Sequence, residues 1–150
     1  MPALVLPARA SSENVALAFL ATLPGITSAM VAAVLPADTS KWASTGFITA
    51  TPVAGLPGID IPTRHPLVQV DCWAVKPGAQ RPPWGQVDQL TEAVVAGCQA
   101  ARPVTLTVTA GASTAHARML GVWVATEPMR LYSDDSSYAR KRLDLRLDWV

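Results

Sequence analysis

The clearest pattern of apolar and polar positions lies between residues 67 and 100. Residues 67–75 alternate, so that one strand face is small and apolar while the other is mixed. After a loop rich in Pro and Gly, apolar residues recur at helical spacing from Trp84 to Cys98. A strand with one clean apolar face suits a sheet covered on one side. We therefore expect the helix to pack on the small-residue face, formed by Val68, Val70, Cys72 and Ala74.

Similar patterns predict a second helix and further strands. Ser11 and Ser12 offer an N-cap for a helix over 13–23, which Pro24-Gly25 ends. Alternating or β-branched apolar residues predict the remaining strands, over 30–35, 47–53, 104–109, 119–126 and 138–149. The order of elements indicates an α+β domain, with a mainly antiparallel sheet and two helices on one face. Residues 1–12 are expected to form an extended arm, either loose or laid on a neighbour, and 13–150 a single domain.

Two connections stand out as candidate contact surfaces. Residues 54–66 contain three prolines and two glycines, which predicts a long irregular loop that projects from the sheet. Residues 129–137 are interpreted as a polar, acidic loop with Asp134 and Asp135 at its tip. Residues 111–117, between the two, are interpreted only as a turn or loose connection.

The last strand carries leucines on one face and alternating charges on the other. Charges on one strand face are about 6.5–7 Å apart, so they can pair along the strand or with a neighbouring strand. Basic residues such as Arg130, Arg140 and Lys141 are offset by acids, which argues against a nucleic-acid stripe. We interpret this face as solvated or salt-bridged, and an interface with another chain is the alternative.

Composition limits the class of protein. Half of the 150 residues are apolar and 15% are charged, which excludes a charge-dominated disordered chain, and the net charge of +1 provides no general attraction for nucleic acid or membranes. No apolar run approaches a membrane span, and no signal peptide is expected. Cys72 and Cys98 lie on predicted apolar faces, so we expect buried free thiols; a disulfide between them is the open alternative.

No catalytic, cofactor-binding or metal-binding motif is found. His65 and His116 are interpreted as solvated loop histidines. Asp71 and Cys72 are adjacent on a strand and point to opposite faces, so Asp71 cannot activate the thiol; we expect it to be hydrogen-bonded or at an interface. Trp42 and Trp149 are hard to bury in the predicted fold, and exposed aromatic residues favour protein interfaces.

Three segments carry a resemblance to a known family. They are a helix and short strand ending in proline (16–35), the strand 66–74 before an amphipathic helix, and Glu127-Pro128 with its acidic loop leading through Tyr138-Ala139-Arg140 into the last strand. In order and spacing, the chain resembles the tail terminator, or tail completion, proteins of long-tailed bacteriophages, which are minor tail proteins.

The resemblance implies a ring, usually a hexamer, at the head-proximal end of the tail tube in the virion neck. Such a ring is assembled in the host cytoplasm, stops tube growth, and joins the tube protein to a head connector or stopper protein. DNA passes through its lumen without sequence recognition, and no enzyme activity, cofactor, metal or membrane is implied. The candidate partner or subunit contacts are Ile59, Asp60, Arg64, Asp134, Asp135, Arg140, Arg142, Asp144, Arg146 and Trp149.

Two alternatives stay open. One is another phage assembly protein, such as a head-tail connector or a tail-tube protein. The other is a small enzyme or ligand-binding α+β domain, which a strict monomer with a deep polar pocket would favour.

Overall fold

The structure is a computed structural model that describes residues 9–110 and 112–150. Within these residues the chain forms two α-helices, two short 3-10 helices and a set of strands joined in one sheet. In chain order they are α1 (Ser12–Leu20), η1 (Ser28–Met30), β1 (Val31–Ala32), η2 (Thr39–Lys41), β2 (Phe47–Pro57), β3 (Arg64–Val75), α2 (Trp84–Ala100), β4 (Val104–Ala110), β5 (Ser113–Val124), β6 (Met129–Leu131) and β7 (Tyr138–Trp149).

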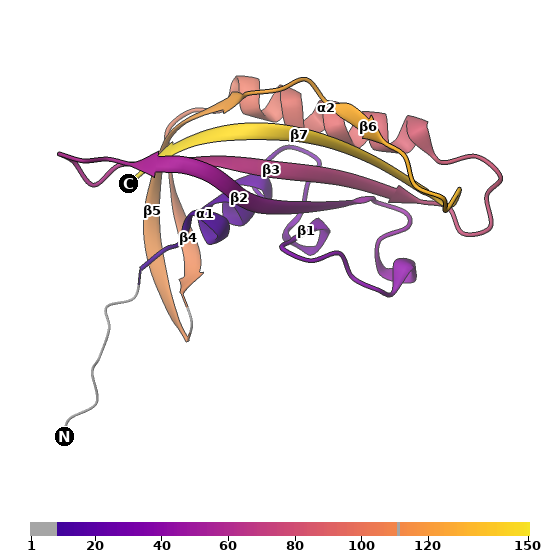
Figure 1. Ribbon diagram of the computed structural model, residues 1–150. Coiled ribbons are helices and arrows are strands. Elements are labelled where there is room, and N and C mark those ends of the chain that lie inside the picture. Colours follow the sequence, from indigo (N-terminus) through magenta and orange to yellow (C-terminus); the bar gives the residue numbers. More distant parts are fainter. Residues whose placement is uncertain (1–8, 111) are drawn as a thin grey trace.

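The sheet has seven strands in the order β1-β2-β3-β7-β5-β4, and β6 also pairs with β7. β1 runs parallel to β2, and the other strand pairs of the described chain are antiparallel. β7 is central because it pairs with β3 on one side and with both β5 and β6 on the other. The α+β class expected from the sequence is confirmed. Figure 1 shows that the sheet curls, so that β4 and β5 run across the direction of β3 and β7.

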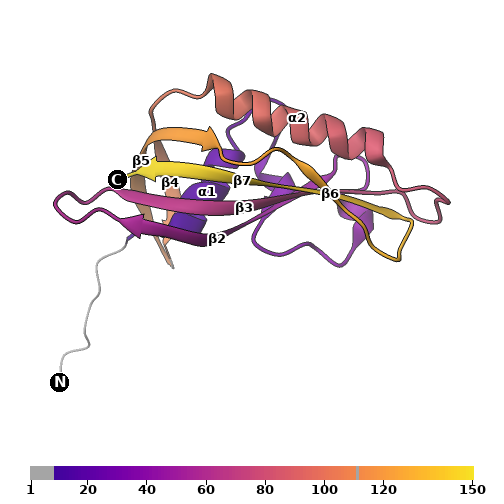
Figure 2. The same ribbon diagram turned by 45° about the horizontal axis from the view of Figure 1, so that its top comes forward.

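Both helices contribute to the same hydrophobic core. α2 contacts β3, β5 and β7, whereas α1 contacts β4, β2 and β3. The small-residue face of β3 lies in this core together with Val87, Val94 and Cys98 of α2. This confirms the prediction that the second helix covers that face, and Figure 2 shows α2 lying along the sheet.

The last strand was predicted with the bounds that the structure has. Its leucines Leu143, Leu145 and Leu147 are at most 1% exposed, as the alternating pattern requires. Other bounds were wrong: α1 ends at Leu20 rather than at residue 23, and residues 30–35 form only the two-residue strand β1 after η1. β5 begins at Ser113, so most of 111–117 is strand rather than turn, and the loop 129–137 begins with β6.

The predicted irregular loop over 54–66 is the largest correction. β2 continues to Pro57 and β3 begins at Arg64, so these residues form the distal end of the β2–β3 hairpin, with its turn at 58–63. A bulge between Pro52 and Ala54 shifts the register, and Gly55 pairs with Pro66 at a positive φ of 126°, which explains why the local sequence does not look like a regular strand. The hairpin still projects at one end of the sheet (Figure 1).

The expectation that Trp42 and Trp149 are hard to bury was also wrong. They are 1% and 6% exposed, and each indole N–H has a partner. Trp42 donates to the Pro36 carbonyl at 3.2 Å, and Trp149 donates to Ser12 Oγ at 3.0 Å. Most of the predicted arm, residues 1–8, lies outside the described residues. No helix in the described part of the chain is long and apolar enough to cross a membrane.

Candidate protein interface

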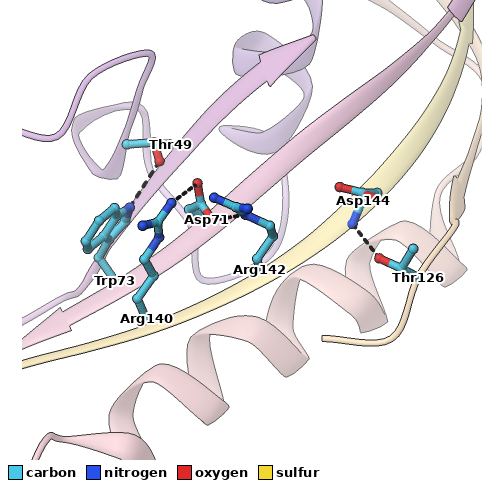
Figure 3. Close-up of polar contacts among 7 residues, drawn as sticks. All are labelled: Thr49, Asp71, Trp73, Thr126, Arg140, Arg142 and Asp144. Carbon is cyan, nitrogen blue, oxygen red and sulfur yellow. Dashed lines mark hydrogen bonds and ion pairs between the residues drawn. The ribbon is translucent and has the colours of Figure 1, made fainter. Parts of the chain in front are cut away.

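α1 and α2 pack on one face of the sheet, and we call the other the outer face. At one end of the sheet the outer face is covered by Trp42, which packs with Phe47 and Val75. Because side chains alternate along a strand, the outer face carries the residues that lie between the buried positions of β3 and β7. Cross-strand pairing aligns Asp71 with Arg142 and Trp73 with Arg140, while Trp123 of β5 is aligned with Arg146. Figure 3 shows the centre of this face, where β3 and β7 meet.

Asp71 is the centre of an ion-pair cluster on the outer face. Its two carboxylate oxygens accept one bond each, from Arg140 Nη2 and from Arg142 Nε, both at 3.0 Å (Figure 3). The Asp71 side chain is only 9% exposed, and the arginine side chains are 30% and 32% exposed. A largely buried carboxylate therefore organises two partly exposed guanidiniums. The predicted salt-bridged face is confirmed here, with pairing across strands rather than along β7.

The indole ring of Trp73 packs against one of these arginines. The Arg140 guanidinium carbon lies 4.5 Å from the Trp73 ring centroid, a cation–π arrangement. Trp73 in turn donates its indole N–H to Thr49 Oγ1 at 3.0 Å (Figure 3). Arg140 Nε is buried without a hydrogen-bond partner in the described residues. The contacts with Asp71 and Trp73 fix the orientation of the Arg140 side chain.

A second group lies toward the hairpin end of the outer face. His65 Nδ1 is 2.6 Å from Asp148 Oδ1, which joins β3 to β7. The same two residues line a shallow hollow with Trp123 and Arg146. Trp123 is 53% exposed, a large value for a tryptophan on a sheet. The interpretation of His65 as a solvated loop residue was therefore wrong, because the hairpin pairing brings it to Asp148.

The other candidate contacts predicted from the sequence lie at the two ends of the sheet. Ile59 and Asp60 lie in the exposed turn of the hairpin. Asp134 and Asp135 lie in the exposed loop between β6 and β7, at the opposite end (Figure 1), and Asp135 accepts a bond from the Ser137 N–H at 2.8 Å. The structure therefore does not bring these two predicted sets together.

Arg64 and Trp149 lie side by side, where β3 begins and β7 ends. The Arg64 guanidinium carbon is 5.2 Å from the Trp149 ring centroid. Because Trp149 is buried under the start of α1, it supports this arginine and offers little surface to a partner. Asp144 has its backbone N–H bonded to Thr126 Oγ1 at 2.9 Å, which fixes the segment after β5 against β7 (Figure 3).

The thiols and the second histidine add no reactive group to this face. Cys72 and Cys98 are free and buried, as predicted, and burial raises the pKa of each thiol to about 12. His116 lies on β5 rather than in a loop and is exposed, 3.3 Å from Thr107 Oγ1. Residues 9–110 and 112–150 contain no group of three His, Cys, Asp or Glu side chains that could hold a metal ion.

Exposed apolar side chains complete the surface. The hairpin exposes Leu56 (79%), Ile59 (97%) and Ile61 (62%), and Met129 beside the outer face is 58% exposed. Sequence reasoning missed Leu56, Ile61 and Trp123, because their exposure depends on which strands pair. Arg, Trp and Met are the residue types enriched in protein interfaces, so the outer face and the hairpin have the composition of a docking surface. Neither a protein-family model nor a curated protein matches the chain.

Proposed function

We propose that this protein is a structural subunit of a long-tailed bacteriophage, a tail terminator that forms a ring at the head-proximal end of the tail tube. In this role it stops tube growth and joins the tail to the head connector, in the neck of the virion. The proposal comes from the sequence resemblance. The structural observation that supports it most is that the two ends of the sheet expose surfaces of different chemistry. The apolar hairpin lies at one end and the acidic loop with Asp134 and Asp135 at the other.

A ring terminator needs two different axial surfaces and a repeated lateral one. An apolar hairpin end and an acidic loop end are unlike, so they fit two different partners, the tube protein and the connector or stopper protein. Lateral contacts between copies must be heterologous, because only head-to-tail contacts close into rings larger than a dimer. The outer face and its arginines supply side chains for such contacts, either between subunits or toward a lumen that passes DNA without reading its sequence.

Interface matching, rather than a reaction, is the mechanism of this role. Growth stops when one ring surface copies the contact between tube rings and the opposite surface does not. The Asp71 cluster supports this role because it orients Arg140 and Arg142 in advance, which lowers the entropy lost on binding.

Electron microscopy of virions that carry a labelled copy of this chain tests the proposal. The label is expected once per particle, at the junction of head and tail, and light scattering of the purified chain is expected to show a ring-sized assembly under conditions that mimic the tube end. A label repeated along the tail would instead identify a tube protein. A particle that lacks the label, or one labelled only at the distal tip, would contradict the proposal.

A further inference from the structure

A hollow lies beside the turn of the β2–β3 hairpin and the segment that leads into α1. It has a volume of about 480 Å³, which is within the range of pockets that bind small ligands. Its lining comes from residues 9–10, from both sides of the hairpin turn, from β5 and from the end of β7. Because these segments meet only in the folded sheet, no local motif in the sequence marks the hollow.

The lining of the hollow contains positive side chains and no acidic one. Arg9, Arg64 and His116 all line it, and all three are exposed. Neither arginine forms an ion pair with another described residue, whereas the arginines of the Asp71 cluster share one carboxylate. The two arginines therefore create a positive potential in the hollow, which the imidazole, neutral or charged, does not cancel.

Two acidic side chains at this end of the sheet do not line the hollow. Asp60 lies in the hairpin turn and is exposed to solvent. Asp148 is bonded to His65, whose Nδ1 lies 2.6 Å from the Asp148 Oδ1. The described chain thus leaves the arginines of the hollow without a carboxylate partner, and an anion from another molecule can take that place.

The structure holds Arg64 in place at the hollow. Its backbone lies between Pro57 of β2 and Trp149 of β7, so β3 is paired on both sides at this residue. The guanidinium carbon lies 5.2 Å from the Trp149 ring centroid, and the Trp149 indole is itself bonded to Ser12. An arginine stacked on a buried indole loses less side-chain freedom when it binds a carboxylate.

We propose that the hollow binds acidic side chains, Asp or Glu, from a segment of the partner protein that seats on the hairpin end. The inference rests on the proposed function, which places one of two different partners at this end, and it names the chemistry of that contact. A guanidinium matches a carboxylate with two parallel N–H donors, and such charge-assisted bonds are stronger than neutral ones. Partial enclosure by the lining reduces the screening that weakens exposed ion pairs.

The apolar surroundings of the hollow favour a protein over a nucleic acid. Prolines, alanines and Trp149 share the lining with the arginines. Ile59 and Ile61 of the same turn are 97% and 62% exposed. A protein segment with acidic and apolar side chains covers both kinds of surface at once, whereas a phosphate backbone offers no apolar group. A nucleic-acid site would also need a cationic stripe longer than one hollow.

Fluorescence anisotropy with a labelled hexaglutamate peptide tests the site, with labelled hexaglutamine as the neutral probe. We expect the wild type to bind hexaglutamate at least about tenfold more tightly than hexaglutamine. The double variant Arg9→Gln, Arg64→Gln should weaken hexaglutamate binding by about tenfold or more. Arg81→Gln is the matched control, because Arg81 is exposed in the loop after β3, at the opposite end of the sheet, and it should bind like the wild type.

Circular dichroism and thermal unfolding are measured alongside. The single variant Arg9→Gln keeps the test valid if the double variant fails to fold, because Arg9 lies outside the helices and strands; it should weaken hexaglutamate binding by about threefold or more. Equal binding of hexaglutamate by the wild type and these variants would overturn the proposal. An oligonucleotide with six phosphates that displaces labelled hexaglutamate at a lower concentration than unlabelled hexaglutamate does would assign the hollow to nucleic acid and also overturn it.

Photo-crosslinking in assembled virions identifies what occupies the hollow. Pro62 is exposed and belongs to the lining, so p-benzoylphenylalanine in its place reaches the occupant. We expect a crosslink to another virion protein, within a segment that contains at least two Asp or Glu residues. A crosslink to the acidic loop of a neighbouring copy, to DNA or to a segment without acidic residues would overturn the proposal, and so would particles without a crosslink at this position.

The outcomes separate the acidic contact from the proposed role. A virion label at the junction of head and tail, together with hexaglutamate binding that does not depend on Arg9 and Arg64, would overturn the acidic contact and leave the tail terminator standing. A label at the distal tip would overturn the terminator role, whereas hexaglutamate binding that depends on the two arginines would still support a site for acidic side chains.

Discussion

On the outer face, the charge of Asp71 is the one that we expect to matter most for folding stability, because its nearly buried carboxylate accepts hydrogen bonds from two arginines. In Asp71→Ala, Arg140 and Arg142 lose this acceptor while Arg140 remains packed on Trp73. Both arginines are about one-third exposed, so water screens part of the loss. We expect the free energy of unfolding to fall by about 2 kcal/mol, measured by urea denaturation.

Asp134→Ala is the charge-matched control for this experiment, since Asp134 lies in the exposed loop between β6 and β7. Its free energy of unfolding should stay within about 0.5 kcal/mol of the wild type. Equal stabilities of the two variants would show that the Asp71 cluster does not stabilise the fold.

The buried thiol of Cys72 leads us to expect that the free energy of unfolding falls at high pH. Burial raises the pKa of its thiol from 9.0 to about 12, so between these values the folded protein keeps a proton that the unfolded protein releases. The stabilisation linked to the protonated thiol is complete below pH 9 and is lost as the pH rises toward 12. Its slope is at most about 1.4 kcal/mol per pH unit.

The measurement compares the free energy of unfolding of the wild type and Cys72→Ala across this pH range. The stability advantage of the wild type over the variant should be constant at neutral pH and should shrink as the thiol of the unfolded state ionises. Subtracting the two curves removes the contribution of Cys98, which both proteins share. A pH-independent difference would contradict the assignment.

At the scale of elements, the β2–β3 hairpin depends on one glycine. Gly55 has a φ of 126°, and an added Cβ would overlap the backbone of His65 and Pro66. Gly55→Ala should therefore lower the free energy of unfolding by about 2 kcal/mol or more. Gly85 in the first turn of α2 has open space around its Cα, so Gly85→Ala should instead stabilise the protein by about 0.5 kcal/mol. Chemical denaturation of both variants checks the opposite signs.

The same hairpin shows which elements can be predicted from sequence. The strand 138–149 has strict alternation and was predicted to the residue, because a period of two with leucines on one side has no competing interpretation. In residues 54–66, prolines, glycines and a bulge suppress the strand pattern, although pairing with β3 still forms the ladder. Local sequence carries no information about that partner strand, and this is the physical reason for the error.

The candidate interface was predictable to a similar degree. The mixed face of residues 67–75 and the charged face of the last strand are visible in the sequence. That Asp71 lies opposite Arg142, or that His65 reaches Asp148, depends on the register of β3 and β7, which only the folded sheet defines. Trp149 was assigned to an interface because its buried partner, Ser12, lies 137 residues away in the chain.

At the scale of the whole molecule, the hairpin turn should matter for assembly and not for folding. Ile59 is 97% exposed, so replacing it changes the folded monomer little, and Ile59→Asp should keep the free energy of unfolding within about 0.5 kcal/mol. If the turn is buried between proteins in the virion, the new charge loses its hydration there. We then expect assembly to require about a tenfold higher concentration, measured by light scattering with tail tubes present.

Val34→Asp is the matched control, because Val34 is 77% exposed and its neighbour Leu35 packs with Phe47, at the end of β2 opposite the hairpin turn. Both variants add the same charge at an exposed apolar position, so a general effect of charge or solubility would change their assembly equally. Only a contact made by the hairpin turn would weaken the assembly of Ile59→Asp and leave the assembly of Val34→Asp like that of the wild type. Equal behaviour of the two variants would mean that the exposed apolar turn is not a docking element, and the proposed ring would have to use other surfaces.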